Sequence, residues 1–236
     1  MNRRTRIALF GGTFDPIHLG HLEVARKISR LFEIDELWFV LAQLAPHKQA
    51  RTVTSALHRH AMLALATQAE PKFRISTFEL DAPGRCYTVD TLAHFKAEWG
   101  SSADLYFVMG ADSWSEINTW RDSDRLLALT NHIVVSRPGY QLGTNHIGPE
   151  IADRIVDLRR TENHATVGPA AAAGNTGTGE KIFITDAVMT DVSATDIRRA
   201  ARAGGAGLAD MAPAAVADYI EKYELYRDWD EREFNH

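Results

Sequence analysis

The stretch that decides the fold is residues 7–21, IALFGGTFDPIHLGH. Its first four residues form a short apolar run typical of a buried strand, and two glycines follow directly. Glycines allow backbone conformations that other residues rarely adopt, and they let the main chain approach a ligand closely. Apolar residues then recur at helical spacing up to Leu31, so His18 and His21 are expected on one face of a helix beginning. Strand, turn and helix together predict a phosphate-binding turn.

The two histidines suit such a turn chemically. A helix beginning offers N–H groups and the positive end of a dipole, so anions bind there readily. Imidazoles add donors that can carry positive charge near neutral pH. A zinc site is disfavoured, because neither paired cysteines nor a His-Glu-x-x-His spacing accompanies them. Gly-x-Gly-x-x-Gly and Walker-type Gly-Lys-Ser/Thr motifs are also lacking. Taken singly, each histidine is better explained as a surface residue of an ordinary glycine-rich turn; only the whole string is specific.

A second anion-binding pattern lies near the other chain end, at residues 193–198, SATDIR. Ser193 is a typical helix N-cap, Asp196 completes a weak capping box, and Gly204-Gly205 is expected to end the helix. The segment's two hydroxyls and its guanidinium would also hold a polyphosphate well. A plain capped helix explains the segment equally well when it is read alone.

Strand-like and helix-like segments alternate along the chain. Runs rich in β-branched or aromatic residues occur at 7–10, 36–41, 73–78, 104–109, 132–136 and 181–185. Amphipathic windows lie between them at 21–31, 57–68, 89–99, 122–129 and 150–160. This order predicts an α/β fold, a doubly wound and mostly parallel sheet with helices on both faces. Ligands of such folds bind beyond the carboxyl ends of the strands, where the opening motif lies.

Length and composition predict one globular domain over residues 1–226 and a charged tail over 227–236. Residues 161–180, rich in Ala, Gly and Thr, are expected to form a flexible inserted loop. The net charge of −5 argues against a nucleic-acid partner. The single cysteine, Cys86, excludes an internal disulfide and suits a reducing compartment. Without a signal-peptide core or an apolar stretch of membrane-spanning length, a cytoplasmic protein with no membrane partner is expected. The oligomeric state is left open, a homo-oligomer included.

Eight segments in a fixed order carry a family resemblance: 11–21, 45–48 (APHK), 87–92 (YTVDTL), 110–112 (GAD), Trp120, 136–139 (SRPG), 193–198 and 216–226. Together they resemble the bacterial nicotinate-nucleotide adenylyltransferases, of the nucleotidyltransferase superfamily with a His-x-Gly-His motif and a Rossmann-like fold. The resemblance implies adenylyl transfer from ATP to nicotinate mononucleotide, giving nicotinate adenine dinucleotide and pyrophosphate in NAD biosynthesis. Because Mg²⁺ commonly keeps its waters and takes few protein ligands, it is expected on the ATP phosphates, with no dedicated protein site.

The resemblance also implies roles for individual residues. His18, His21 and Arg198 are the expected catalytic groups, with His18 stabilising the transition state. The residues expected to bind ATP are Gly11, Gly12, Thr13, Phe14, His18, His21, Gly110, Asp112, Ser193, Thr195 and Arg198. Those expected to bind the mononucleotide are Thr13, Lys48, Tyr87, Thr88 and Trp120, with His47 as a helper. The nucleophile is a phosphate oxygen that is already anionic, so no general base is required.

Several alternatives stay open. The Trp and Tyr rings could be core or rim residues, Lys48 a solvated charge, and Asp112 a helix cap. A sister enzyme that uses CTP or transfers to phosphopantetheine is the nearest rival, and a non-catalytic nucleotide sensor is the rival of another class. Ala45 replaces a proline frequent in the family, and the role of Arg85 and the preference for nicotinate over nicotinamide are not decided by the sequence. The whole interpretation requires both helix beginnings to converge on one triphosphate.

Overall fold

The computed structural model describes residues 3–43, 53–136, 142–143, 147–159, 179–186 and 192–228. Its contacts divide the chain into two compact units. The first comprises residues 1–11, 24–39 and 86–189, and the second residues 12–23, 40–85 and 190–236. Lys48, His47, Arg137 and most of the expected insertion and charged tail lie outside the described residues. The single domain expected over residues 1–226 stays a prediction.

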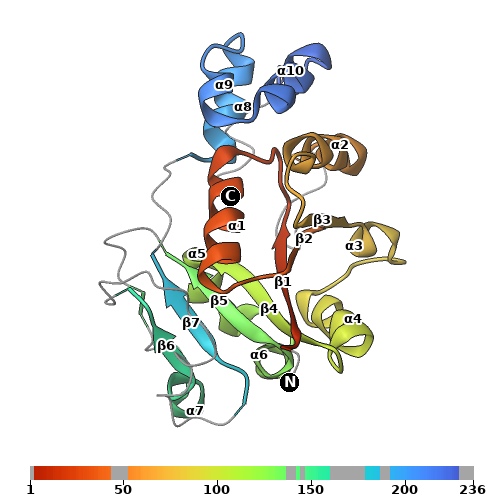
Figure 1. Cartoon of the computed structure of the whole chain (residues 1–236). Helices are drawn as coiled ribbons and strands as arrows, with labels where there is room; N and C mark the ends of the chain where they lie inside the picture. Colours follow the sequence, from red (N-terminus) through yellow and green to blue (C-terminus); the bar gives the residue numbers. More distant parts are fainter. Residues whose placement is uncertain are drawn as a thin grey trace. The chain divides into compact units, whose positions relative to one another are not determined.

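The described strands form one seven-stranded sheet in the order β3-β2-β1-β4-β5-β7-β6. They are β1 (Thr5–Gly12), β2 (Glu36–Leu41), β3 (Phe73–Ser76), β4 (Ala103–Gly110), β5 (Asn131–Val135), β6 (Ile155–Asp157) and β7 (Ile182–Thr185). The pairs β1–β4, β4–β5, β5–β7 and β6–β7 are all parallel. Figure 1 shows β4, β5 and β7 side by side in the first unit. The predicted α/β fold with a parallel sheet is therefore confirmed.

The first unit buries both faces of its strands. Phe32, which follows α1 (Leu19–Leu31), packs against Tyr106 of β4 and Phe183 of β7, with ring centroids 5.9 and 5.2 Å away. Phe107 and His132 alternate with those side chains and therefore project from the other face. The described helices α4 (Thr88–Trp99), α5 (Ala111–Ser115) and α6 (Ser123–Leu129) contact β4 or β5.

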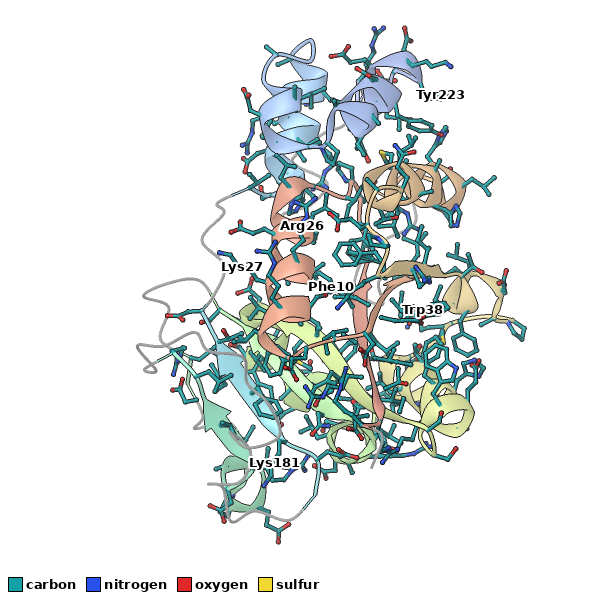
Figure 2. All side chains as sticks on the ribbon, viewed as in Figure 1. Phe10, Arg26, Lys27, Trp38, Lys181 and Tyr223 are labelled. Atoms are coloured by element: carbon teal, nitrogen blue, oxygen red, sulfur yellow. The ribbon has the colours of Figure 1, made fainter. Side chains whose placement is uncertain are left out.

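The burial of side chains along helix α1 follows the helical spacing of its apolar residues, which is why the sequence predicted this helix correctly. Ala25 and Ile28 are fully buried, whereas Arg26 is exposed and Lys27 half-buried. Figure 2 shows Arg26 and Lys27 on the outer side of the helix. The apolar stripe at helical spacing thus packs against the sheet, and the charged face remains in solvent.

The second unit contains helices from distant parts of the sequence. They are α2 (Ala56–Thr67), α3 (Phe78–Asp81), α8 (Ala194–Arg202), α9 (Leu208–Met211) and α10 (Ala214–Lys222). Helix α10 packs on α2, where Nδ1 of His58 lies 2.9 Å from the Tyr219 hydroxyl. Gly204 and Gly205 have φ of 99° and 88°, and α8 ends just before them. Glycine readily takes this left-handed conformation, so the predicted end of the helix is confirmed.

One element prediction is wrong. Residues 150–160 do not form one amphipathic helix: α7 (Pro149–Ala152) covers four residues, and β6 begins at Ile155. The β-branched pair Ile155-Val156 instead joins the edge of the sheet beside β7. In this short segment the tertiary pairing decides between helix and strand, which periodicity alone could not. No helix among the described residues has the length and apolarity needed to cross a membrane.

Candidate active site

The opening motif forms a buried loop between β1 and α1. Phe14, Asp15, Ile17 and His18 are all at most 7% exposed. Such burial is unusual for a loop, because its main-chain polar groups then need partners inside the protein. The Gly12 carbonyl accepts a hydrogen bond from the Ala42 N–H at 3.0 Å.

Gly11 and Gly12 do not have the special backbone conformation that the sequence predicts. Among the residues of the motif, positive φ falls on Phe14, at 47°, and not on Gly11 or Gly12. A Cβ placed on Gly12 would lie only 2.8 Å from the Phe14 ring, and one on Gly11 would lie 3.3 Å from Phe107. The expectation of special glycine conformations is therefore wrong. A Cβ on Gly12 is therefore disfavoured by the Phe14 ring, whereas a Cβ on Gly11 would need only a small shift of the Phe107 ring.

His18 and His21 stack on each other. Their ring centroids are 3.6 Å apart, with an angle of 29° between the planes. The main-chain N–H of His18 donates to Nδ1 of His21 at 3.3 Å, and the N–H of His21 donates to Nδ1 of His18 at 3.4 Å. Because each Nδ1 accepts, the ring proton of each neutral imidazole is assigned to Nε2. Phe14 packs its ring against that of His21, at 5.1 Å.

Burial keeps both imidazoles neutral. It lowers the pKa of His18 to about 4, against an opposing effect of Asp196. Burial and the neighbouring His18 also lower the pKa of His21 well below its ordinary value. The positive charge expected near neutral pH is therefore absent from this pair in the structure. Each ring is instead assigned a neutral form with its proton on Nε2.

The second motif forms the capped helix beginning that its sequence predicts. The Ser193 hydroxyl accepts a hydrogen bond from the Asp196 N–H at 3.2 Å and donates to the Asp196 carboxylate at 2.5 Å. The hydrogen bonds from Ser193 lower the pKa of that carboxyl group. The Ser193 cap and the Asp196 box are thus confirmed.

Arg198 connects the two motifs within the second unit. Its side chain is 4% exposed; Nη1 donates to the Asp15 carbonyl at 2.6 Å and Nη2 to Oγ1 of Thr195 at 3.0 Å. A Cβ on Gly20 would lie 3.5 Å from the Val192 carbonyl, so the two helix beginnings also approach each other through the main chain. The two helix beginnings therefore lie close together, and their convergence on one triphosphate stays a prediction.

Arg59 supports this loop from helix α2. Its guanidinium is 1% exposed and donates to the carbonyls of Thr13, Ala42, Gln43 and Thr54, at 2.8 to 3.0 Å. The sequence gives a signal for it, because an arginine stands on a helix face otherwise made of Met62, Leu63 and Ala66. A buried guanidinium needs many acceptors, and here they are main-chain carbonyls.

The sequence analysis did not predict that Asp15 has a central role in this cluster of buried polar groups. Its Oδ1 accepts from the Tyr226 hydroxyl at 2.8 Å and its Oδ2 from the Thr54 N–H at 3.0 Å. Burial lowers the pKa of both Arg59 and Arg198, and Asp15 opposes that shift in each. The charge of one carboxylate thus affects the pKa of two buried cations, although its oxygens accept hydrogen bonds from neutral donors. The aspartate is visible in the sequence, but its partners are 39 and 211 residues away in sequence, so no local pattern indicates them.

Of the residues expected at the mononucleotide, Tyr87, Thr88 and Trp120 lie in the first unit, Thr13 lies in the second unit, and Lys48 lies outside the described residues. Tyr87 is the N-cap of α4 and Thr88 its first residue, as the sequence predicts for a helix beginning. Trp120 is half-buried and follows the 3-10 helix η1 (Ile117–Thr119). The Arg121 guanidinium lies over the Tyr87 ring, 4.5 Å from its centroid. Arg121 was not predicted, although its position directly after Trp120 could have indicated it.

Gly110 and Asp112 lie where β4 passes into α5. Gly110 is the last residue of the strand and the N-cap of the helix, and Asp112 stands exposed in the first helical turn. The Asp112 carbonyl accepts the N–H of Glu116, which ends the helix. An exposed carboxylate at the carboxyl end of a parallel strand remains suited to a ribose hydroxyl.

Comparisons with known proteins agree with this geometry. The family model described as "Cytidylyltransferase-like" matches residues 9–200. A Thermoanaerobacter sp. protein and a Moorella thermoacetica protein, both named "Probable nicotinate-nucleotide adenylyltransferase", are 37% and 35% identical over 227 residues. The alignments cover 96% of this chain and 97% and 94% of those proteins.

Solved structures support the fold. A Plasmodium falciparum nicotinic acid mononucleotide adenylyltransferase complexed with NaAD matches with a TM-score of 0.68 at 21% identity. The match covers 96% of this chain and 98% of that one. With relatives above one-third identity along nearly the whole sequence, the chain belongs to the nicotinate-nucleotide adenylyltransferase family.

Proposed function

We propose that this protein transfers the adenylyl group of ATP to nicotinate mononucleotide, giving nicotinate adenine dinucleotide and pyrophosphate. The observation that carries the proposal is the contact of Arg198 with the Asp15 carbonyl, which unites the two phosphate motifs of the family in one buried cluster. The names of the relatives support the choice of both substrates.

The reaction needs alignment and charge stabilisation. A phosphate oxygen of the mononucleotide attacks the α-phosphorus of ATP, the bond from that phosphorus to the bridging oxygen breaks, and pyrophosphate leaves. Holding two reactants in line can contribute roughly 7–11 kcal/mol in favourable cases. Fixed donors aimed at the developing charge supply much of the rest.

We assign the donors as follows. The Nε2–H groups of His18 and His21 bind the ATP phosphates, with His18 at the transition state. Ser193, Thr195 and Arg198 hold the departing pyrophosphate. The attraction for the anion comes from the arginines, because Arg59 and Arg198 are buried beside the single carboxylate of Asp15. The imidazoles act as neutral donors whose direction is fixed in advance by their Nδ1 hydrogen bonds.

For the acceptor, we propose that Trp120 and Tyr87 stack on the pyridine ring. The Arg121 guanidinium over the Tyr87 ring places a positive charge beside this proposed aromatic site. Thr88 would offer its hydroxyl and N–H to the carboxylate at the start of α4. Lys48 would bind the mononucleotide phosphate and Asp112 a ribose hydroxyl.

Magnesium is assigned to the substrate. Within the described ranges, no group of three or more His, Cys, Asp or Glu side chains is arranged to hold a metal ion. The Asp15 carboxylate already accepts two hydrogen bonds. We therefore propose that Mg²⁺ would be held by the triphosphate oxygens and its own waters, where it would supply charge neutralisation for the leaving group.

A substrate panel tests the proposal. The wild-type protein is mixed with ATP or CTP, each with nicotinate mononucleotide, nicotinamide mononucleotide or phosphopantetheine, and pyrophosphate release is measured. ATP with nicotinate mononucleotide should give the highest kcat/KM. A preference for CTP or phosphopantetheine would identify a sister activity. ATP binding without pyrophosphate release under every acceptor would instead indicate a nucleotide sensor.

A further inference from the structure

Tyr226, near the C-terminal end of the described residues, contacts the loop between β1 and α1. The Tyr226 hydroxyl donates to Oδ1 of Asp15 at 2.8 Å, while the Thr54 N–H donates to Oδ2 at 3.0 Å. Asp15 is 5% exposed, so both carboxylate oxygens are held by neutral donors inside the protein. We refer to Asp15, Thr54 and Tyr226 as the Asp15 latch.

The backbone around Tyr226 has a conformation that is unusual for residues other than glycine. Glu224 and Tyr226 have φ of 54° and 67°, in the left-handed region that non-glycine residues rarely adopt. The turn is closed by a hydrogen bond from the Leu225 N–H to the Ile220 carbonyl of α10. Burial raises the pKa of the Tyr226 hydroxyl well above its ordinary value, and Asp15 adds to that shift. The hydroxyl therefore remains protonated and can only donate to the carboxylate.

Arg198 contacts the same aspartate in another way. Its guanidinium binds the neutral Asp15 carbonyl at 2.6 Å, while the carboxylate is held by Tyr226 and Thr54. Ion pairs between carboxylate and guanidinium are stronger than hydrogen bonds to neutral donors. If Oδ1 lost the Tyr226 hydroxyl, the carboxylate would be left buried with one unsatisfied oxygen, and Arg198 is a cation within the same cluster.

We propose that Tyr226 is a positioning residue for adenylyl transfer. The Asp15 latch keeps the Asp15 carboxylate away from the Arg198 guanidinium and thereby preserves that cation for the pyrophosphate end of ATP. The turn after α10 is thus part of the catalytic apparatus, although it binds no substrate. The proposal rests on the proposed function.

Tyr226→Phe removes only the hydroxyl. The carboxylate should then turn to Arg198, so kcat/KM for ATP should fall about tenfold, as expected for one lost charge-assisted contact. The KM for nicotinate mononucleotide should change less than about twofold, because the acceptor uses other groups. Calorimetry with ATP alone should show the same weakening, and this readout does not depend on turnover.

A control and a rescue make the test specific. Tyr223→Phe removes a hydroxyl three residues earlier, from a ring that is 49% exposed at the outer end of α10 (Figure 2), and activity should stay at the wild-type level. Adding Asp15→Asn to Tyr226→Phe removes the competing charge and should restore part of the ATP affinity. The double variant should therefore bind ATP more tightly than Tyr226→Phe alone.

Three outcomes would overturn the proposal. They are unchanged ATP binding in Tyr226→Phe, equal loss toward both substrates, or a further loss on adding Asp15→Asn. The last two would indicate a merely structural hydrogen bond. A wild-type protein that binds ATP but releases no pyrophosphate would sink the proposed function, and the calorimetric comparison would still test the latch.

Discussion

His18 and His21 show how far a residue's chemistry depends on its surroundings. Two histidines at a helix beginning predict cations, yet stacking and burial make them neutral donors. The sequence could place them on one helix face. It could not show that each Nδ1 accepts the main-chain N–H of the other residue, because that depends on the path of the loop.

Removing the His18 ring should therefore impair chemistry more than binding. In His18→Ala, one preorganised donor is lost, and kcat should fall on the order of 10²–10³-fold. Steady-state pyrophosphate release measures this loss, with circular dichroism to check folding. His18→Ala that folds and turns over near the wild-type rate would refute the assignment.

Trp120 offers a test of the acceptor side. Trp120→Ala removes the flat surface proposed for the pyridine ring, so the KM for nicotinate mononucleotide should rise about tenfold, and the KM for ATP should hardly change. Initial rates with one substrate saturating and the other varied separate the two constants. Equal effects on both would count against stacking.

At the scale of elements, the sequence predicted helices correctly where the spacing of apolar residues or the residues typical of helix ends were clear. Helix α1 follows its apolar spacing, and helix α8 follows its Ser193 cap and its glycine stop. Residues 150–160 failed because β6 gains its stability from β7, a partner that periodicity does not reveal. Three of the four carbonyl partners of Arg59, on Thr13, Ala42 and Gln43, could not be predicted, because they lie on segments that only the fold brings to α2.

Helix α2 should therefore stabilise the loop between β1 and α1 through Arg59. Arg59→Met leaves buried carbonyls without their donor, and the free energy of unfolding should fall by about 3–5 kcal/mol. Urea unfolding measures the change. Arg30→Met, at an exposed arginine on α1, is the matched control and should stay within about 0.5 kcal/mol of wild type. Equal loss in both variants would contradict the structural role.

At the scale of the whole molecule, the alternation of strands and helices predicted the parallel sheet. That alternation could not predict that a polar side chain such as His132 is buried. This residue was expected only as part of a strand, yet it is completely buried beside Phe107. Neither of its ring nitrogens has a hydrogen-bond partner among the described residues.

His132 should make the protein sensitive to acid. Burial, helped by Arg154, lowers its pKa from 6.5 to about 3. The unfolded chain therefore binds a proton that the folded chain excludes, and stability falls as pH drops from about 6.5 toward 3, by up to roughly 1.4 kcal/mol per pH unit. Above pH 6.5 this residue adds no pH dependence.

His132→Leu should flatten that slope without abolishing it, because His18 and His21 are also shifted downward. Chemical unfolding at pH 7.5, 6.0 and 5.0 measures the difference between variant and wild type. His94→Leu, at an exposed histidine on α4, serves as the control. The same slope in His132→Leu and wild type would show that the buried ring stays uncharged in both states.

The contact between Gly12 and Phe14 has a consequence for how this family can vary. With only 2.8 Å between the ring and the place of a Cβ, even alanine at position 12 collides with the aromatic side chain two residues later. A larger residue becomes tolerable there only when position 14 shrinks at the same time. Substitutions at positions 12 and 14 should therefore occur together among members of the family. A library that randomises both positions should recover combinations that neither single substitution allows.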